Sequence, residues 1–349
     1  MNRKITNAVV LMTALVPTVG HKFLIDFAKK LISFDGKVHV ILRTMDKEPV
    51  TSNIRLYAIL DAYYYCDDVV FHILHRDVPQ GPDEHPDFWN VWRDIVREFV
   101  DVQPDDYFVA SELYGMDMAR VLGCNFMPCN RYREVFPISG TEVLKDLMKN
   151  FEYILPEFQR HIRKTITIFG PESCGKTTMA KALAKELNGW FVPEWAREYL
   201  ETVGAEVTDE RMQAIVYGQA ALQKTAKNDL FDKPFIFQDT DLFSTLGYYR
   251  LWGGGTDRDI DLCEYLAKQL KSDFYIVMND GIPFVADPLR YGGDKRESGM
   301  QFWIDLLEEF KLPYYVAPNT SKHMQTNYAC SAVIEMFEQS TQHIRGYKR

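Results

Sequence analysis

Short apolar runs alternate along the whole chain with longer segments of helical spacing. Ala8–Met12 and Val38–Leu42 consist mainly of aliphatic residues, as is typical of strands that a parallel sheet buries on both faces. Between them, apolar side chains recur every three or four positions from His21 to Ile32, which predicts a helix. Strands that alternate with helices predict an α/β fold with doubly wound parallel sheets. The other expected strands are Asp68–Ile73, Tyr107–Ala110, Thr165–Phe169, Trp190–Val192, Pro234–Gln238, Phe274–Met278 and Leu312–Val316.

The alternation continues over 349 residues, a length that favours two domains over a single core. A segment rich in Lys, Glu and Arg, Glu142–Arg163, is predicted to be a helical connector that Pro156 interrupts. We therefore expect one doubly wound domain over residues 1–160 and another over residues 161–349. A last helix, from about Asn327 to Gln342, is expected to close the second domain.

One loop of the second half has the composition of a phosphate-binding loop. Gly170-Pro171-Glu172-Ser173-Cys174-Gly175-Lys176-Thr177 lies between an expected strand and an expected helix, Met179–Leu187. Its glycines let backbone N–H groups face phosphate oxygens, and the helix N-terminus adds a favourable dipole. Lys176 would reach the β- and γ-phosphates, and Thr177 would hold Mg²⁺ by its hydroxyl. An accidental glycine turn is the alternative. The residues expected to bind ATP here are Gly170, Glu172, Ser173, Cys174, Gly175, Thr177 and Thr178.

Carboxylates follow two of the expected strands in this half. Glu194 comes after Trp190–Val192 and could act as the base, or an orienting group, for an acceptor hydroxyl. Arg197 lies one turn on and could clamp a substrate oxygen, although an i, i+3 surface salt bridge also explains it. Asp239 ends an apolar strand, where a P-loop enzyme holds its Mg²⁺, and Asp241 is the second choice.

A loop after the strand Phe274–Met278 combines glycines with several cations. It runs from Pro283 to Arg296 and includes Arg290. Such a loop suits a lid that closes over a triphosphate, with Arg290 and Arg296 as ATP-binding residues. A solvated charged loop is the alternative.

Composition and charge narrow the class of protein. Hydrophobic residues make up 46% of the chain, and the formal charge of −9 argues against a general nucleic-acid binder. No apolar stretch is long enough to span a bilayer. The cysteines form no CxxC pair, so neither a zinc site nor a disulfide framework is indicated. We expect a cytoplasmic protein without nucleic-acid or membrane partners, and a homo-oligomer is compatible with the sequence.

The turn after the first strand carries Thr18, Gly20 and His21 at a helix start. A histidine in this place can stabilise the phosphates of ATP, and a structural histidine that caps the helix explains it equally well. The turn resembles the HxGH signature of nucleotidylyltransferases, with Thr18 in place of the first histidine. These enzymes transfer AMP from ATP to a phosphate and release pyrophosphate, which makes His21 the catalytic candidate and Thr18 and Gly20 ATP-binding candidates.

Two later segments extend this resemblance. Ser111–Gly115 resembles the SE-x-YG segment of one branch of the superfamily. The turn with Ser139 and Thr141 resembles the motif (I/V)S-x-T-x-(I/V)-R, whose Ser and Thr contact ATP phosphates in the family. The arginine that ends the motif is Leu144 here. A cation on the departing phosphates is therefore missing unless Lys145 replaces it.

Two tryptophans complete the expected site of the first domain. Trp89 and Trp92 lie in a segment that resembles one whose tryptophan stacks on a nicotinamide ring. A cationic pyridinium over an indole face is favourable. Their i, i+3 spacing is also that of a core-facing side of a helix.

An HxGH-like domain before a P-loop kinase domain, with the segments EWAREY (194–199), DTD (239–241) and DPLR (287–290), resembles the NadR family over nearly the whole chain. The resemblance implies phosphorylation of nicotinamide riboside to nicotinamide mononucleotide (NMN) in the second domain. It also implies adenylyl transfer from ATP to NMN, giving NAD and pyrophosphate, in the first. Mg²⁺ is the implied cofactor, and Trp195, Arg197 and Asp241 are the implied substrate-binding residues. Some members carry an N-terminal helix-turn-helix domain, whereas this chain starts at its first strand.

Two other interpretations stay open. The chain could be a kinase for another nucleoside with a vestigial first domain, or a slow regulator that senses NAD and ATP. The intact Lys176, Thr177 and Asp239 favour an enzyme over a sensor.

Overall fold

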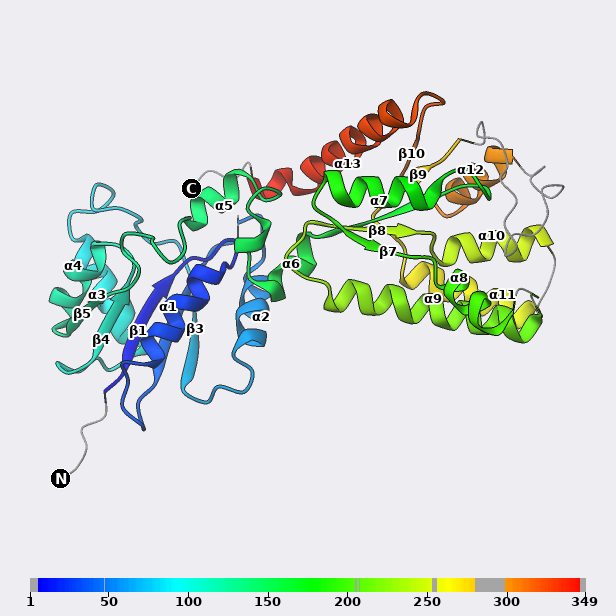
Figure 1. Cartoon of the computed structure of the whole chain (residues 1–349). Coiled ribbons are helices and arrows are strands. Elements are labelled where there is room, and N and C mark those ends of the chain that lie inside the picture. The colour runs from blue at the N-terminus through cyan, green and yellow to red at the C-terminus, as the bar shows by residue number, and fades with distance from the viewer. Residues whose placement is uncertain are drawn as a thin grey trace. The chain divides into compact units, whose positions relative to one another are not determined.

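The computed structural model describes residues 6–46, 48–204, 206, 208–252, 256–279 and 299–345. The chain divides into two compact units, one of residues 1–159 with 342–349 and the other of residues 160–341. Figure 1 shows the elements of both units. Among the described residues, no helix combines the length and the apolar character that crossing a membrane requires.

The first unit has a parallel sheet in the order β3-β2-β1-β4-β5. β1 (Ala8–Met12) lies in the centre and pairs with β2 (Val38–Thr44) on one side and β4 (Tyr107–Ala110) on the other. The chain order reverses between β1 and β4, so the crevice at their carboxyl ends is the expected ligand position of a doubly wound sheet. The remaining elements are α1 (Val19–Lys29), α2 (Ser52–Ala62), β3 (Val69–His75), α3 (Phe88–Phe99), α4 (Tyr114–Leu122), β5 (Asn125–Pro128), α5 (Gly140–Lys145), a 3₁₀ turn (Phe151–Tyr153) and α6 (Pro156–Ile162).

The second unit has a parallel sheet in the order β10-β9-β6-β8-β7, with β6 (Lys164–Phe169) in its centre. Figure 1 shows α7 (Lys176–Glu186) on one side of this sheet and α9 (Asp209–Asp229) on the other. The remaining elements are β7 (Trp190–Val192), α8 (Trp195–Val203), β8 (Phe235–Asp239), α10 (Leu242–Trp252), α11 (Asp257–Gln269), β9 (Phe274–Val277), α12 (Gly299–Glu309), β10 (Tyr314–Val316) and α13 (Lys322–Arg345).

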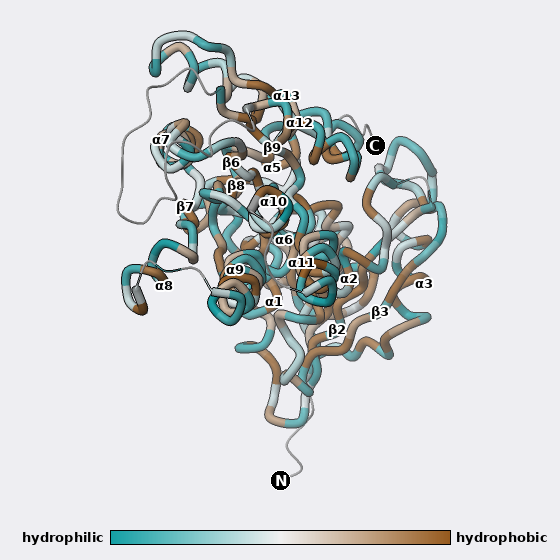
Figure 2. Tube along the Cα trace, turned by 90° about the vertical axis from the view of Figure 1, so that its right-hand side faces the viewer, coloured by the Kyte–Doolittle hydropathy of each residue, from teal (hydrophilic) through white to brown (hydrophobic). Residues whose placement is uncertain are grey.

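The hydropathy pattern explains why these segments form these elements. β8 is buried at every position, as expected for an inner strand that helices cover on both faces. In Figure 2 the trace of β2 is largely brown, whereas the coils of α9 and α11 carry both brown and teal. Such amphipathic helices bury one side and leave the other polar. The predicted α/β fold with two doubly wound parallel sheets is confirmed.

The structure departs from the predicted elements most clearly in two segments. β5 was not expected, because Asn125–Pro128 is too short to show a period. The predicted helical connector over Glu142–Arg163 is wrong as one element, since it consists of α5, the 3₁₀ turn and α6. Pro156 does not interrupt a helix but begins α6, where its missing N–H costs nothing.

Candidate functional site

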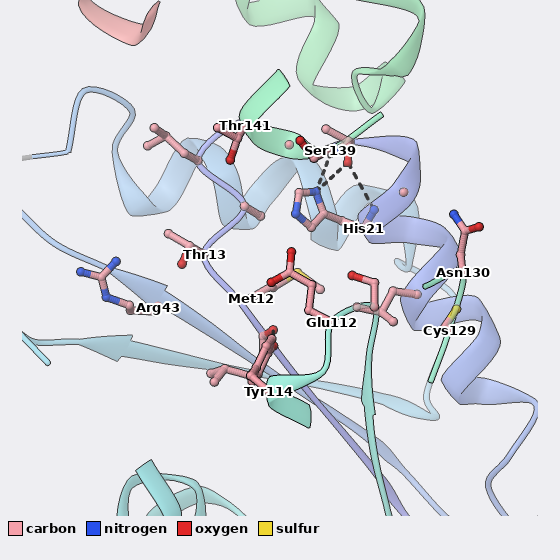
Figure 3. Close-up of a pocket in the computed structure, with 18 of the residues that line it drawn as sticks. Met12, Thr13, His21, Arg43, Glu112, Tyr114, Cys129, Asn130, Ser139 and Thr141 are labelled. Atoms are coloured by element: carbon pink, nitrogen blue, oxygen red, sulfur yellow. Dashed lines mark hydrogen bonds between the residues drawn. The ribbon is translucent and has the colours of Figure 1, made fainter. Parts of the chain in front are cut away.

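A cavity of about 670 Å³ opens at the carboxyl ends of β1 and β4 in the first unit. Residues that follow β1, residues that follow β4 and the start of α5 form its walls. All of the site residues expected in this unit line it, namely Thr18, Gly20, His21, Trp89, Trp92, Ser139 and Thr141. Figure 3 shows the imidazole ring of His21 with the turn of Ser139 and Thr141 above it and the side chain of Glu112 below it.

His21 is held by the residue that caps its own helix. Thr18 is the N-cap of α1, and its backbone N–H donates to Nδ1 of His21 at 3.0 Å. The Thr18 hydroxyl lies 2.8 Å from the same nitrogen and also accepts the His21 N–H. Because Nδ1 accepts a backbone hydrogen bond, the neutral ring carries its proton on Nε2. The capping threonine thus selects the tautomer that donates from Nε2.

The starts of α1 and α5 lie close together, as the surroundings of Gly140 show. A Cβ at this position would lie 3.4 Å from Cε1 of His21 and 3.9 Å from Nε2. Ser139 caps α5 in a capping box with Glu142: its Oγ accepts the Glu142 N–H at 3.1 Å. Hydrogen bonds from the Ser139 N–H and hydroxyl lower the pKa of Glu142. The imidazole and the hydroxyls of Ser139 and Thr141 therefore belong to one wall of the cavity.

Two arginines in this cavity were missed by sequence reasoning. Arg43, just before the end of β2, is 2% exposed, and its Nη1 lies 3.6 Å from Glu48 Oε1. Arg133 donates from Nη2 to Glu112 at 3.3 Å and from Nη1 to the Ile138 carbonyl at 3.4 Å. Leu144 lines the cavity, but Lys145 is not among the lining residues. A basic residue near a strand end was the available signal for Arg43, and proximity to the Ser139 turn was the signal for Arg133.

The core-facing interpretation of the tryptophan pair holds for Trp92. Trp92 is 6% exposed and packs in the core of the unit, with its Nε1 donating to the Pro79 carbonyl at 2.9 Å. Trp89 is only partly buried and meets Phe88 edge to face at 4.9 Å. Trp89 is therefore the more exposed of the two tryptophans that line the cavity.

The second unit has a cavity of about 190 Å³ at the end of β6. The loop that forms it adopts backbone conformations which glycine favours, with φ of +129° at Gly170 and +91° at Gly175. Lys176 Nζ donates to the carbonyls of Gly170 at 3.0 Å and Pro171 at 2.7 Å. The cavity is lined by Glu172, Ser173, Gly175, Lys176, Thr177, Thr178, Glu194, Ala196, Arg197, Leu200, Asp239 and Tyr248.

Thr177 and Asp239 bring two oxygens together in this cavity. The Thr177 hydroxyl donates to Oδ2 of Asp239 at 2.5 Å, and Asp239 is 3% exposed. A hydroxyl and a carboxylate oxygen are ligands that suit Mg²⁺, which takes few protein ligands and completes its shell with phosphate oxygens and water. The residues therefore fit the ion. Within the described part of the chain, no group of three or more His, Cys, Asp or Glu residues could hold a metal by itself.

Glu194 contributes the third carboxylate of this cavity after Glu172 and Asp239. It lies at the N-cap of α8, and burial raises the pKa of its side chain to about 7, although the neighbouring Lys176 opposes the shift. Arg197 lines the same cavity one turn later and lies 4.0 Å from Glu201. Tyr248 of α10 is a further lining residue that no sequence motif indicated.

Four expected site residues lie near the cavity without lining it. Gly170 shapes the loop backbone, and Cys174 is buried with its thiol directed at the Pro171 carbonyl. The Trp195 ring stacks on Tyr199 with 4.8 Å between the ring centroids. Asp241 is 1% exposed and accepts hydrogen bonds from the Tyr275 hydroxyl at 2.7 Å and the Ser244 N–H at 3.1 Å.

Burial raises the pKa of Asp241 to about 6. Since its carboxylate oxygens are engaged within the fold, Asp241 stabilises the start of α10 and faces β9. The lid segment Pro283–Arg296, with Arg290 and Arg296, lies outside the described residues.

Comparison with known proteins gives matches to both units. Residues 165–324 match the profile of a family described as an AAA domain. The trifunctional NAD biosynthesis/regulator protein NadR of Escherichia coli is 24% identical over 281 residues, which is 77% of this chain. The Salmonella typhimurium protein of the same name is 24% identical over 279 residues. The chain spans 66% of the length of each of these relatives.

Two solved structures of a NadR protein share the fold of nearly the whole chain. One is in complex with NR, covers 95% of this chain and 96% of its own, and has a TM-score of 0.63 at 20% identity. The other is in complex with NAD and AMP-PNP, covers 96% of this chain and 97% of its own, and has a TM-score of 0.65 at 20% identity. The chain is therefore a homologue of the NadR proteins, and it shares their fold across both units.

Proposed function

We propose that the protein is a bifunctional enzyme of NAD biosynthesis. The second unit would phosphorylate nicotinamide riboside with ATP, giving NMN and ADP. The first unit would transfer AMP from ATP to NMN, giving NAD and pyrophosphate. The observation that carries the proposal is the presence of two separate cavities in a NadR homologue, one with a P-loop and one with His21 at a helix start.

In the kinase reaction, the acceptor hydroxyl oxygen attacks the γ-phosphorus, and the bond from this phosphorus to the bridging oxygen of ADP breaks. Glu194 accepts the hydroxyl proton, and its pKa of about 7 suits a base that works near neutral pH. Lys176 would leave the Gly170 and Pro171 carbonyls for phosphate oxygens. Mg²⁺, held by Thr177 and Asp239, would neutralise charge on the transferred phosphoryl group.

In the adenylyl transfer, a phosphate oxygen of NMN attacks the α-phosphorus of ATP. The bond between that phosphorus and the oxygen bridging to the β-phosphate breaks, and pyrophosphate leaves with the electron pair. His21 donates from Nε2 to a phosphate oxygen, because Thr18 occupies Nδ1. Trp89 offers its indole face to the nicotinamide ring, whose positive charge favours this contact.

The test is to incubate the protein with ATP and Mg²⁺ and to supply either nicotinamide riboside or NMN, with product masses measured separately. We expect NMN, followed by NAD, from the riboside, and NAD alone from NMN. Lys176→Ala should abolish phosphorylation of the riboside and leave conversion of NMN to NAD largely intact. If Lys176→Ala removes both activities from a folded protein, the assignment to two separate sites is wrong.

A further inference from the structure

Adenylyl transfer in the cavity of the first unit would need a positively charged side chain near the leaving pyrophosphate. Leu144 lines the cavity where the motif that begins at Ser139 would supply an arginine, and Lys145 is not a lining residue. Pyrophosphate that leaves the α-phosphorus gains negative charge, so a cation beside the β- and γ-phosphates stabilises the transition state. Among the described residues that line the cavity, the Lys and Arg side chains are Arg43 and Arg133.

Contacts with neighbouring residues hold the buried side chain of Arg43 in place. It is 2% exposed, and its guanidinium interacts with Glu48 and with the sulfur of Met45. Glu48 also forms an ion pair with the fully buried Arg55. Moving Arg43 toward a ligand would leave a buried carboxylate short of a partner, which is costly. This arginine therefore belongs to the framework of the cavity wall.

Arg133 differs from Arg43 in that its side chain and its partner are both partly exposed. Its side chain is 34% exposed, and that of its partner Glu112 is 64% exposed, so water already screens their 3.3 Å contact. Exposed pairs of this kind contribute little stability, and the exchange of one anion for another is therefore inexpensive. The second contact of Arg133, to the Ile138 carbonyl, is 3.4 Å long and lies one residue before the Ser139 cap. Arg133 thus joins the loop after β4 to the turn that starts α5.

The backbone at Arg133 has a φ of +55°, a conformation that non-glycine residues adopt rarely. Its N–H donates to the Asn130 carbonyl at 2.9 Å, which closes the turn that presents the side chain. Strained residues of this kind persist where the surroundings enforce them, often at ligand sites. The turn therefore holds Arg133 in the lining of the cavity, in contact with Glu112 and with the residue before Ser139.

We propose that Arg133 is the catalytic cation of the first unit and takes the place that Leu144 leaves without charge. The guanidinium leaves Glu112 and binds oxygens of the β- and γ-phosphates of ATP. As the NMN oxygen bonds to the α-phosphorus and pyrophosphate departs with the bond electrons, Arg133 neutralises the growing negative charge. This inference rests on the proposed adenylyl transfer in the same cavity.

The decisive experiment removes the cation at position 133 and supplies one at position 144 instead. Arg133→Gln should lower kcat/KM for ATP in NAD formation by about 10²-fold or more. Adding Leu144→Arg to that variant should raise kcat/KM at least about ten-fold above that of Arg133→Gln, because a positive charge returns to the lining of the same cavity. Arg133→Lys should fall between wild type and Arg133→Gln, since an ammonium keeps the charge but not the bidentate geometry.

Arg131→Gln is the matched control, because Arg131 lies over the Tyr132 ring and does not line the cavity. It should leave NAD formation unchanged. Phosphorylation of nicotinamide riboside should stay at the wild-type rate in every variant, since it takes place in the other unit. Unchanged NAD formation in Arg133→Gln overturns the inference, and so does failure of Leu144→Arg to restore activity in a variant whose melting temperature equals that of the wild type. If the wild type itself forms no NAD from NMN and ATP, the proposed function fails instead.

Discussion

The hydroxyl of Thr177 and the carboxylate of Asp239 form a 2.5 Å hydrogen bond across 62 residues of sequence. Thr177 lies in the first turn of α7, and Asp239 ends the neighbouring strand β8. β6, which leads into the P-loop, pairs with β8 in parallel, so the two carboxyl ends meet at the same edge of the sheet. The fold therefore brings both candidate Mg²⁺ ligands together at one edge of the sheet.

Asp239→Asn should separate the role in metal binding from the role in folding. Asparagine keeps the size and an acceptor for the Thr177 hydroxyl but loses the charge that holds Mg²⁺. We expect kcat for riboside phosphorylation to fall by about 10²-fold or more and the Mg²⁺ concentration at half-maximal rate to rise. Asp241→Asn is the comparison: it should lower the melting temperature and leave the Mg²⁺ dependence unchanged, because Asp241 bonds Tyr275 and Ser244. An unchanged Mg²⁺ dependence in Asp239→Asn would contradict the assigned role.

The pH dependence of the kinase should report Glu194. Burial raises the pKa of this carboxyl group to about 7, and a base acts only when it is deprotonated. kcat/KM for nicotinamide riboside should therefore rise with pH and level off above about pH 7. In Glu194→Gln the rate should fall by about 10²-fold or more and lose this rise. A wild-type profile that is flat from pH 5.5 to 8.5 would show that Glu194 is not the base.

The buried charge of Glu194 should also destabilise the folded protein at high pH. Its folded pKa of about 7 lies above the usual value of 4.5, so the folded state binds the extra proton and stability falls as pH rises between these values. Glu194→Gln removes the buried charge and should be more stable than wild type at pH 8 by about 1–2 kcal/mol, allowing for the partial exposure of the side chain. Below about pH 4.5 the difference should vanish. Thermal melts of both proteins at pH 4.5, 6 and 8 measure it, and a constant difference across this range would speak against the shift.

His21 has a structural and a chemical role that two substitutions distinguish. His21→Ala loses both the imidazole and the capping box with Thr18. His21→Gln keeps a side chain that can accept the Thr18 N–H, as Gln does at the third position of capping boxes. We expect both to lower NAD formation by about 10²–10³-fold, whereas only His21→Ala should lower the melting temperature. Wild-type turnover in His21→Gln would show that His21 caps the helix but has no chemical role in NAD formation.

The local motifs could be predicted because they depend on a few consecutive residues. The P-loop lies between β6 and α7 as expected, since glycines at 170 and 175 permit the backbone that no other residue adopts easily. β1 and β4 have the predicted bounds, because a run of buried aliphatic residues between polar segments marks both ends of an inner strand. Short segments without a period, such as β5, depend on their neighbours and could not be predicted.

The side chains that line the two cavities were harder to predict than the local motifs. Asp239 and Asp241 are two residues apart at the end of one strand, and only the tertiary structure shows that Asp239 lines the cavity while Asp241 contacts Tyr275 of β9. The pairing of Arg133 with Glu112 joins loops that are 21 residues apart.

The sequence alone determined the order of most strands and helices, the phosphate-binding loop and the histidine at the start of α1. Each of these follows from backbone preferences and hydrophobic periodicity over short stretches of chain. The tertiary structure decided which side chains face the cavities, because that depends on how strands pair and how helices pack against them. It also placed Arg133, from a separate turn, in the lining of the first cavity, where Leu144 offers no charge.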